Sequence, residues 1–364
     1  MDPIAHTLVG AALAKSGLQR RSGYAAVALI LGANLPDIDG LTYFSGSDLG
    51  LYFRRGWTHG LPAMALWPFV LAGALSLLDR LLSLGRARFK SLLWLSLLAV
   101  ATHPALDWLN NYGMRWLMPF DDRWFYGDAV FIIDPWIWLG LGGAVFLSSS
   151  RGSLRLASSI LGTMAVSFLI VTGVPDLLPG KLLFLAGLLV FAAARIQNVP
   201  RTESGSERLH RGALAFVALY VLSMVALSAL AHRWTLSKLR EDRLPVQKLM
   251  VAPTPISLFT RDVVFATPTS YRHGSLSLWP SPKLILSPEV IPRNEDSPLA
   301  SRALRQHEVR GFAIWARFPW AEVVEEPEGF RVTLRDARYA RSRRSDGFGT
   351  AVVFLPRETE LNGR

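Results

Sequence analysis

His103 and Asp107 end an otherwise apolar run, and their types and spacing suggest metal chemistry. On an α-helix, positions i and i+4 lie above one another on one face, so both side chains can reach one metal ion. Asn110 and Asn111 follow within the next turn, where they can support such ligands. A helix-end histidine that is hydrogen-bonded to a nearby carboxylate is the alternative. The pair alone leaves both interpretations open.

Other histidines and aspartates lie at the ends of other apolar runs: His6, Asp37, Asp39, His59 and Asp134. Zinc binds imidazole nitrogen and carboxylate oxygen readily, and an Asp-x-Asp pair can bridge two ions. A bound metal activates water near neutral pH, so no serine or cysteine nucleophile is needed. The chain has no cysteine, no Gly-x-Ser-x-Gly and no glycine-rich phosphate loop. The residue types therefore favour a divalent metal, with zinc the expected ion and one or two ions bound.

The elements that must position these residues are membrane helices. Hydrophobic residues make up 51% of the 364, and apolar runs alternate with short basic loops. The net charge of +11 comes from residues in those loops, so we expect it to orient the chain in the membrane rather than to bind nucleic acid. The N-terminus lacks the basic region of a cleaved signal peptide, so we expect the first run to be retained. We predict eight membrane helices, at about residues 3–14, 24–36, 61–78, 91–108, 131–149, 156–173, 182–194 and 213–231.

Basic residues are distributed unequally between alternate connections. Thirteen lie in loops 15–23, 79–90, 149–156 and 195–212, and five lie in the loops on the other side. Cytoplasmic loops carry the excess of Lys and Arg, so the first set is predicted to lie inside. This topology brings all the histidines and aspartates named above to the outer ends of their helices.

The composition changes near residue 234 to charged residues, proline and alternating apolar patterns. Residues 329–334 and 349–355 alternate as strands do. We predict a mainly α multi-pass membrane helix bundle at residues 1–233 and a small β-rich soluble domain at 234–364, the latter outside the cytoplasm. His273 and His307 stand alone there, so we expect no metal site in this domain.

As a set, five motifs resemble the YdjM-like family of membrane-bound metal-dependent hydrolases. They are Pro3-Ile-Ala-His6-Thr, Leu35-Pro-Asp37-Ile-Asp39, Arg55-Gly-Trp-Thr-His59-Gly, His103-Pro-Ala-Leu-Asp107-Trp-Leu-Asn110, and Phe131-Ile-Ile-Asp134-Pro-Trp. More distantly, their order is similar to that of zinc-dependent phospholipases C and related single-strand nucleases. These resemblances imply a hydrolase of the inner membrane. The ligands that they imply are His6, Asp37, His59, His103 and Asp107, with Asp39 and Asp134 as further ligands or the general base.

The leading interpretation is therefore an integral membrane metal-dependent hydrolase acting on a lipid or other phosphoester at the outer interface. Arg54 and Arg55 are candidates to neutralise a substrate phosphate, with contacts to lipid headgroups as the alternative. A non-catalytic, metal-stabilised membrane protein with an interaction or regulatory role is the second interpretation. A transporter is the third, but the later helices are nearly free of the ionisable residues that it would need. Membrane lipids are the expected partners.

Overall fold

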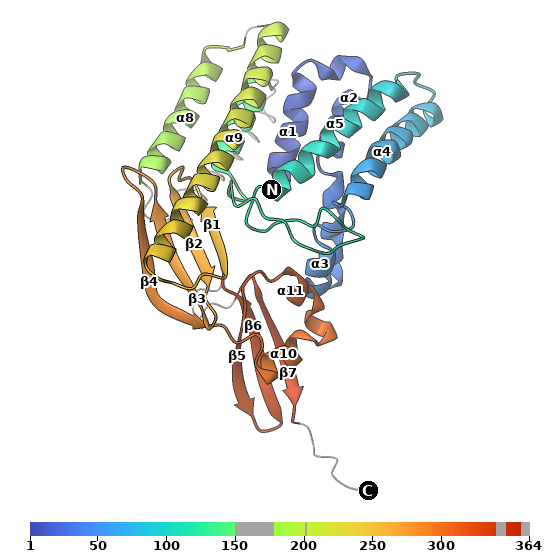
Figure 1. Ribbon diagram of the computed structural model, residues 1–364. Helices are drawn as coiled ribbons and strands as arrows, with labels where there is room; N and C mark the ends of the chain where they lie inside the picture. Colours follow the sequence, from blue (N-terminus) through green and yellow to red (C-terminus); the bar gives the residue numbers. More distant parts are fainter. Residues whose placement is uncertain (150–177, 201, 340–346, 358–364) are drawn as a thin grey trace. The chain divides into compact units, whose positions relative to one another are not determined.

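The computed structural model describes residues 1–149, 178–200, 202–339 and 347–357 (Figure 1). The chain divides into two compact units. The first consists of Met1–Ile38, Arg55–Ser228 and Ala252–Phe259, and the second of Asp39–Arg54, Ala229–Val251 and Thr260–Arg364. The predicted domain boundary at 233/234 falls inside one long helix, α9 (Glu203–Glu241).

The first unit is helical. Its elements are α1 (Pro3–Lys15), η1 (Leu18–Arg21), α2 (Ala25–Gly32), the start of η2 (Leu35–Ser45), α4 (Leu61–Leu81), α5 (Phe89–Trp108), α6 (Pro135–Ser148), α8 (Leu178–Ile196) and most of α9. Among the described residues, α4, α5, α8 and α9 are long and apolar enough to span a membrane, and α2 with η2 forms a bent pair that would be a fifth span. The predicted helical N-terminal part is thus present, with four or five candidate membrane spans among the described residues, and the predicted number of eight is not confirmed. Of the eight predicted spans, 156–173 lies outside the described residues, while α1 and α6 have only 13 and 14 residues.

Aspartate caps with a following proline begin two of these helices. The Asp2 carboxylate accepts hydrogen bonds from the backbone N–H groups of Ile4 and Ala5, both at 3.0 Å, and Pro3 opens α1. Asp134 and Pro135 start α6 in the same way. The caps satisfy N–H groups that the first helical turn leaves without partners, and proline fits where no N–H is needed.

Small residues allow three helices to pack closely. A Cβ on Gly10 of α1 would lie 2.6 Å from the Leu29 carbonyl oxygen of α2, and one on Gly32 would lie 2.9 Å from the Ala99 side chain of α5. Both are closer than a side chain tolerates, so α2 packs tightly against both α1 and α5. The buried residues around these crossings are mostly alanine and leucine.

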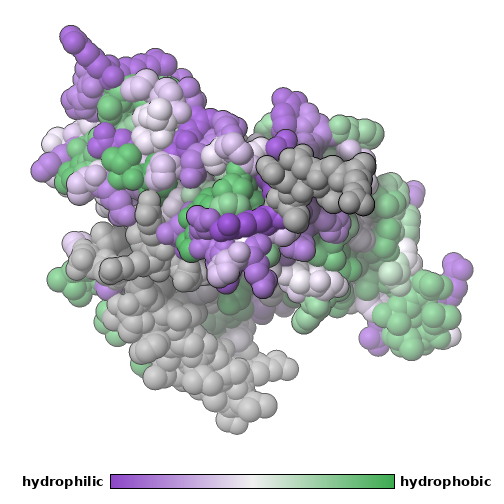
Figure 2. Space-filling model, turned by 90° about the horizontal axis from the view of Figure 1, so that it is seen from below, coloured by the Kyte–Doolittle hydropathy of each residue, from purple (hydrophilic) through white to green (hydrophobic). Residues whose placement is uncertain are grey.

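Apolar side chains also cover the outside of the long helices. Leu66 and Phe69 of α4, Leu189 of α8 and Leu219 of α9 are all at least 58% exposed. Figure 2 shows hydrophobic patches beside hydrophilic ones on one face of the molecule. Apolar surface of this kind suits contact with lipid better than contact with water.

The second unit carries the β structure that was predicted for the C-terminal region. One antiparallel sheet has the order β5-β6-β7, from β5 (Pro319–Glu326), β6 (Gly329–Asp336) and β7 (Thr350–Pro356). The predicted strands 329–334 and 349–355 correspond to β6 and β7. A second sheet has the order β1-β2-β3-β4, from β1 (Lys248–Pro253), β2 (Thr260–Ala266), β3 (Ser270–Ser277) and β4 (Lys283–Pro292).

Short helices complete the second unit: α3 (Ser47–Phe53), α10 (Pro298–Leu304), η3 (His307–Val309) and α11 (Arg310–Trp315). Helix α3 packs on α11 although more than 250 residues separate them. The Asp48 carboxylate accepts hydrogen bonds from the N–H groups of Gly311 and Phe312 at 2.9 and 2.8 Å. Segment Asp39–Arg54 therefore packs with the C-terminal region, which the sequence did not indicate.

Candidate metal centre

Five of the predicted ligands meet in the first unit. His6 comes from the first turn of α1, Asp37 from the start of η2, His59 from the loop before α4, and His103 and Asp107 from the last turns of α5. We call these five residues the His/Asp cluster. Four of them, Asp37, His59, His103 and Asp107, each offer one ligand atom, and these atoms all lie within 4.8 Å of one another.

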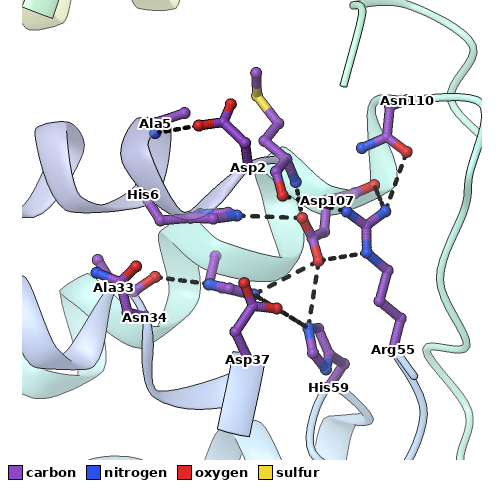
Figure 3. A network of polar contacts seen from close by, with 12 residues as sticks. Asp2, Ala5, His6, Ala33, Asn34, Asp37, Arg55, His59, Asp107 and Asn110 are labelled. Carbon is purple, nitrogen blue, oxygen red and sulfur yellow. Dashed lines mark hydrogen bonds and ion pairs between the residues drawn. The ribbon is translucent and has the colours of Figure 1, made fainter. Parts of the chain in front are cut away.

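Asp107 lies at the centre of the cluster, and its two oxygens face different histidines (Figure 3). Oδ2 is 3.3 Å from His59 Nε2 and 3.5 Å from His103 Nε2. Oδ1 is 3.2 Å from His6 Nε2 and also contacts the amino group of Met1. In this position, one carboxylate oxygen can bind a metal ion together with His59 and His103, and the other oxygen can bind together with His6.

Asp37 also faces two of the histidines. Its Oδ1 is 3.5 Å from His59 Nε2 and 3.4 Å from His103 Nε2. The side chains of the three histidines and Asp107 are fully buried, whereas that of Asp37 is 12% exposed. Asp37 is therefore the edge of the cluster that solvent can reach.

Backbone and hydroxyl contacts orient two histidines. His103 Nδ1 is 2.6 Å from the Ala33 carbonyl oxygen. Because a carbonyl only accepts, this nitrogen carries the proton and Nε2 of the neutral ring presents a lone pair to the cluster. His59 Nδ1 lies 2.9 Å from Thr58 Oγ1, a contact that restrains the orientation of its ring. Such contacts on the far nitrogen are typical of histidines that bind metals.

The donor set fits a divalent cation. His59 Nε2 and His103 Nε2 are 3.1 Å apart, and two carboxylate oxygens face the same space. Nitrogen lone pairs and carboxylates gathered in a buried space repel one another unless a cation or proton lies between them. His6 Nδ1 is also buried and has no hydrogen-bond partner among the described residues, while its ring stacks on His103 with centroids 3.8 Å apart.

Other predicted site residues have different surroundings. Asp39 belongs to the second unit, where its carboxylate pairs with Arg54. Asp134 caps α6: Oδ1 accepts from the N–H groups of Trp136 and Ile137, and Oδ2 accepts from the Tyr220 hydroxyl at 2.8 Å. Neither aspartate is part of the group of four ligands.

Asn110 and Arg55 lie beside the cluster. Asn110 is buried, and its side-chain oxygen accepts from Arg55 and from the Tyr112 N–H, each at 3.0 Å. Asn111 is half-buried. Arg55 is buried and forms an ion pair with Asp107.

Two supporting groups were missed by the sequence analysis. Thr58 directly precedes His59, so its position in the sequence could have indicated this contact. No sequence signal marks the Ala33 carbonyl that orients His103, because a residue of any type has a backbone carbonyl.

Comparison with known proteins agrees with the motifs. Among curated proteins, the chain is similar to YfhP of Bacillus subtilis (strain 168), described as uncharacterized, with 27% identity over 145 residues. This match covers 40% of the present chain and 43% of YfhP. No solved structure matches the chain significantly. Residues 1–175, which contain the whole His/Asp cluster, match the model of the YdjM inner membrane protein family and so confirm the resemblance that the motifs predicted.

Proposed function

We propose that this protein is an integral membrane metal-dependent hydrolase. The observation that carries the proposal is the convergence of two carboxylates and two oriented histidines within 4.8 Å, in a domain that matches an inner membrane protein family. Phosphoesters, including those of lipids, are the proposed substrates. The phosphoester assignment rests on the distant resemblance to zinc-dependent phospholipases C.

Zinc is the proposed ion, since it accepts two imidazoles and two carboxylates in a compact group. Asp37, His59, His103 and Asp107 would hold it, and it would supply a Lewis acid that activates water. His6 faces the remaining oxygen of Asp107, so it is the ligand through which a second ion would be bound.

Asp37 is the carboxylate that we propose to orient the attacking water. The roles of Asp39 and Asp134 as bases stay predictions, and each carboxylate already has partners in its own surroundings. Asp37 is both a member of the group and partly exposed. A carboxylate in that position can orient a water and accept its proton.

The site is proposed to lie at the outer membrane–water interface, with the C-terminal domain also outside the cytoplasm. The support is the distribution of basic residues, thirteen against five. Reporter fusions after Leu355 should work only if the reporter functions externally, and fusions within loop 195–212 should behave in the opposite way. Cytoplasmic reporter activity after Leu355 would contradict this topology.

A non-catalytic metal site is the second candidate function, and one observation favours it. Four protein ligands that are almost completely buried resemble closed structural sites more than open catalytic ones. The two functions differ in whether a small ligand can reach the ion. An exchangeable inhibitor such as azide should perturb a cobalt-substituted catalytic site and leave a closed site unchanged.

The deciding experiment combines metal analysis with turnover. The purified protein in detergent should contain one or two equivalents of metal, and His103→Ala should contain none. His307→Ala is the matched control, because His307 is exposed and lies in the C-terminal domain. Metal-loaded protein is then assayed on a panel of phospholipids and generic phosphodiesters. Metal content without turnover above that of Asp107→Ala would favour the structural site, and metal-free wild-type protein would refute both.

A further inference from the structure

Arg55 has the surroundings of a structural group rather than those of a substrate contact. It is 1% exposed, and its backbone adopts a φ of 51°, a left-handed conformation that is uncommon for residues other than glycine. Such a conformation persists only where the surroundings hold it in place. Its guanidinium also lies over the Tyr112 ring, 4.7 Å from the centroid.

The nitrogens of Arg55 are occupied by acceptors of the chain itself (Figure 3). Nε forms an ion pair with Asp107 Oδ2 at 2.9 Å. Nη1 donates to the Asn110 side-chain oxygen at 3.0 Å, to the Gly113 carbonyl at 3.1 Å and to the Asp107 carbonyl at 3.3 Å. One guanidinium thus holds both the backbone and the carboxylate of Asp107.

This arrangement restricts how the Asp107 carboxylate can rotate. Oδ2 faces Arg55, His59 and His103, while Oδ1 faces His6. A planar guanidinium has a fixed geometry that lysine does not reproduce, so it can select one orientation of a carboxylate.

We propose that Arg55 is a positioning residue that holds Asp107 in the orientation at which one oxygen faces His59 and His103 and the other faces His6. This inference rests on the proposed metal centre. It replaces the predicted contact between Arg55 and a substrate phosphate, because the guanidinium is buried and used within the chain. Phosphate binding by Arg55 is therefore an outcome that the test can detect.

The test measures cobalt affinity by competition with a chelator, together with the visible spectrum of the bound cobalt. Arg55→Gln and Arg55→Lys should bind cobalt about 10–100-fold more weakly, as other losses of support for a metal ligand do, and their spectra should be altered. Added guanidinium ion should restore part of the affinity to Arg55→Ala. Arg54→Gln is the matched control for affinity, because Arg54 pairs with Asp39 in the second unit. Wild-type affinity and spectrum in Arg55→Gln would overturn the proposal, as would a raised KM for a phosphodiester with unchanged metal binding.

A second measurement separates this inference from the metal centre itself. In metal-free protein, Arg55→Gln and Asp107→Asn should be non-additive: the Tm loss of the double variant should be smaller than the sum of the two single losses. Additive losses would contradict the coupling of Arg55 to Asp107 even if the wild type binds metal. Non-additive losses in a wild type that binds no metal would refute the proposed function and leave the coupling intact. The same comparison of Tm losses is made with Arg55→Lys in place of Arg55→Gln. The result therefore does not depend on one variant being folded.

Discussion

Asp107 and Asp336 are both completely buried beside arginine, yet their surroundings differ in kind. Asp336 accepts hydrogen bonds from the N–H groups of Arg317 and Arg338 at 2.6 and 2.9 Å and from the Arg338 guanidinium at 2.9–3.1 Å. Asp107 faces ring nitrogens, and that of His103 presents a lone pair. Burial and charge alone therefore do not distinguish the two carboxylates.

The difference lies in what the neighbours can donate. The groups around Asp336 are N–H donors, so the carboxylate is satisfied within the chain and its role is structural. Arg55 and the Met1 amino group donate to Asp107, but Asp37 and the His103 lone pair bring further acceptors into the same buried space, where a cation would bridge them. We infer that the balance of donors and acceptors identifies a metal centre better than the number of acidic residues does.

The largest expected effect is the loss of metal from Asp107→Asn. The amide keeps the shape of the side chain but removes the charge and one acceptor oxygen that face the histidines. Elemental analysis should show a fall from one or two equivalents to background. Asp336→Asn, which makes the same chemical change at the other buried carboxylate, should keep its full metal content. Equal metal losses in both variants would abolish the distinction between the two sites.

The next effect is on stability and falls on the second unit. Asp336→Ala leaves the Arg338 charge buried without its partner, which typically costs about 3–5 kcal/mol. Amide exchange in β6, followed in the full-length protein under increasing urea, should report this loss. Cobalt affinity per folded molecule should not change. Retention of wild-type exchange in β6 would show that the Asp336 pair adds little to stability.

The sequence predicted the parts of the site that depend on local spacing and on which helix end carries each residue. His103 and Asp107 are one turn apart on α5, and His6, Asp37 and His59 lie at the ends of runs that alternate in direction. The expected convergence rested on the prediction that these runs cross a membrane in turn. The YdjM-like motifs added the expectation that these residues act together.

The remaining features depend on long-range contacts that residue types do not encode. Asp39 and Asp37 look equivalent in sequence, but Asp39 pairs with Arg54 in the other unit. Packing of α3 on α11 depends on Gly311, where a Cβ would lie 1.9 Å from the Asp48 carbonyl oxygen. An isolated glycine 263 residues away gives no sign of that contact. Asp134 has a helix-cap pattern, with proline next to it, and that pattern describes its observed contacts.

A smaller effect should follow from removing the hydroxyl that orients His59. Thr58→Val keeps the shape of the side chain and removes the contact between Oγ1 and Nδ1. Losing such a contact typically weakens metal binding about 10–100-fold. Chelator competition measures the change, and Thr58→Ser should retain most of the affinity because it keeps the hydroxyl. Wild-type affinity in Thr58→Val would show that backbone packing alone orients the ring.

The smallest effect concerns the response of Asp336 to pH. Burial raises the pKa of this carboxyl, but the charge of Arg338 and the hydrogen bonds from Arg338 and Arg317 outweigh it, so the pKa lies below its usual 3.8. The folded state therefore favours the ionised form. The stabilisation is fully present above about pH 3.8 and is lost as the pH falls through the lower pKa of the folded protein. Urea midpoints from β6 amide exchange should thus decline more steeply below pH 4 in the wild type than in Asp336→Asn, which has no group to titrate there. Parallel declines would mean that other carboxyl groups dominate acid unfolding of the second unit.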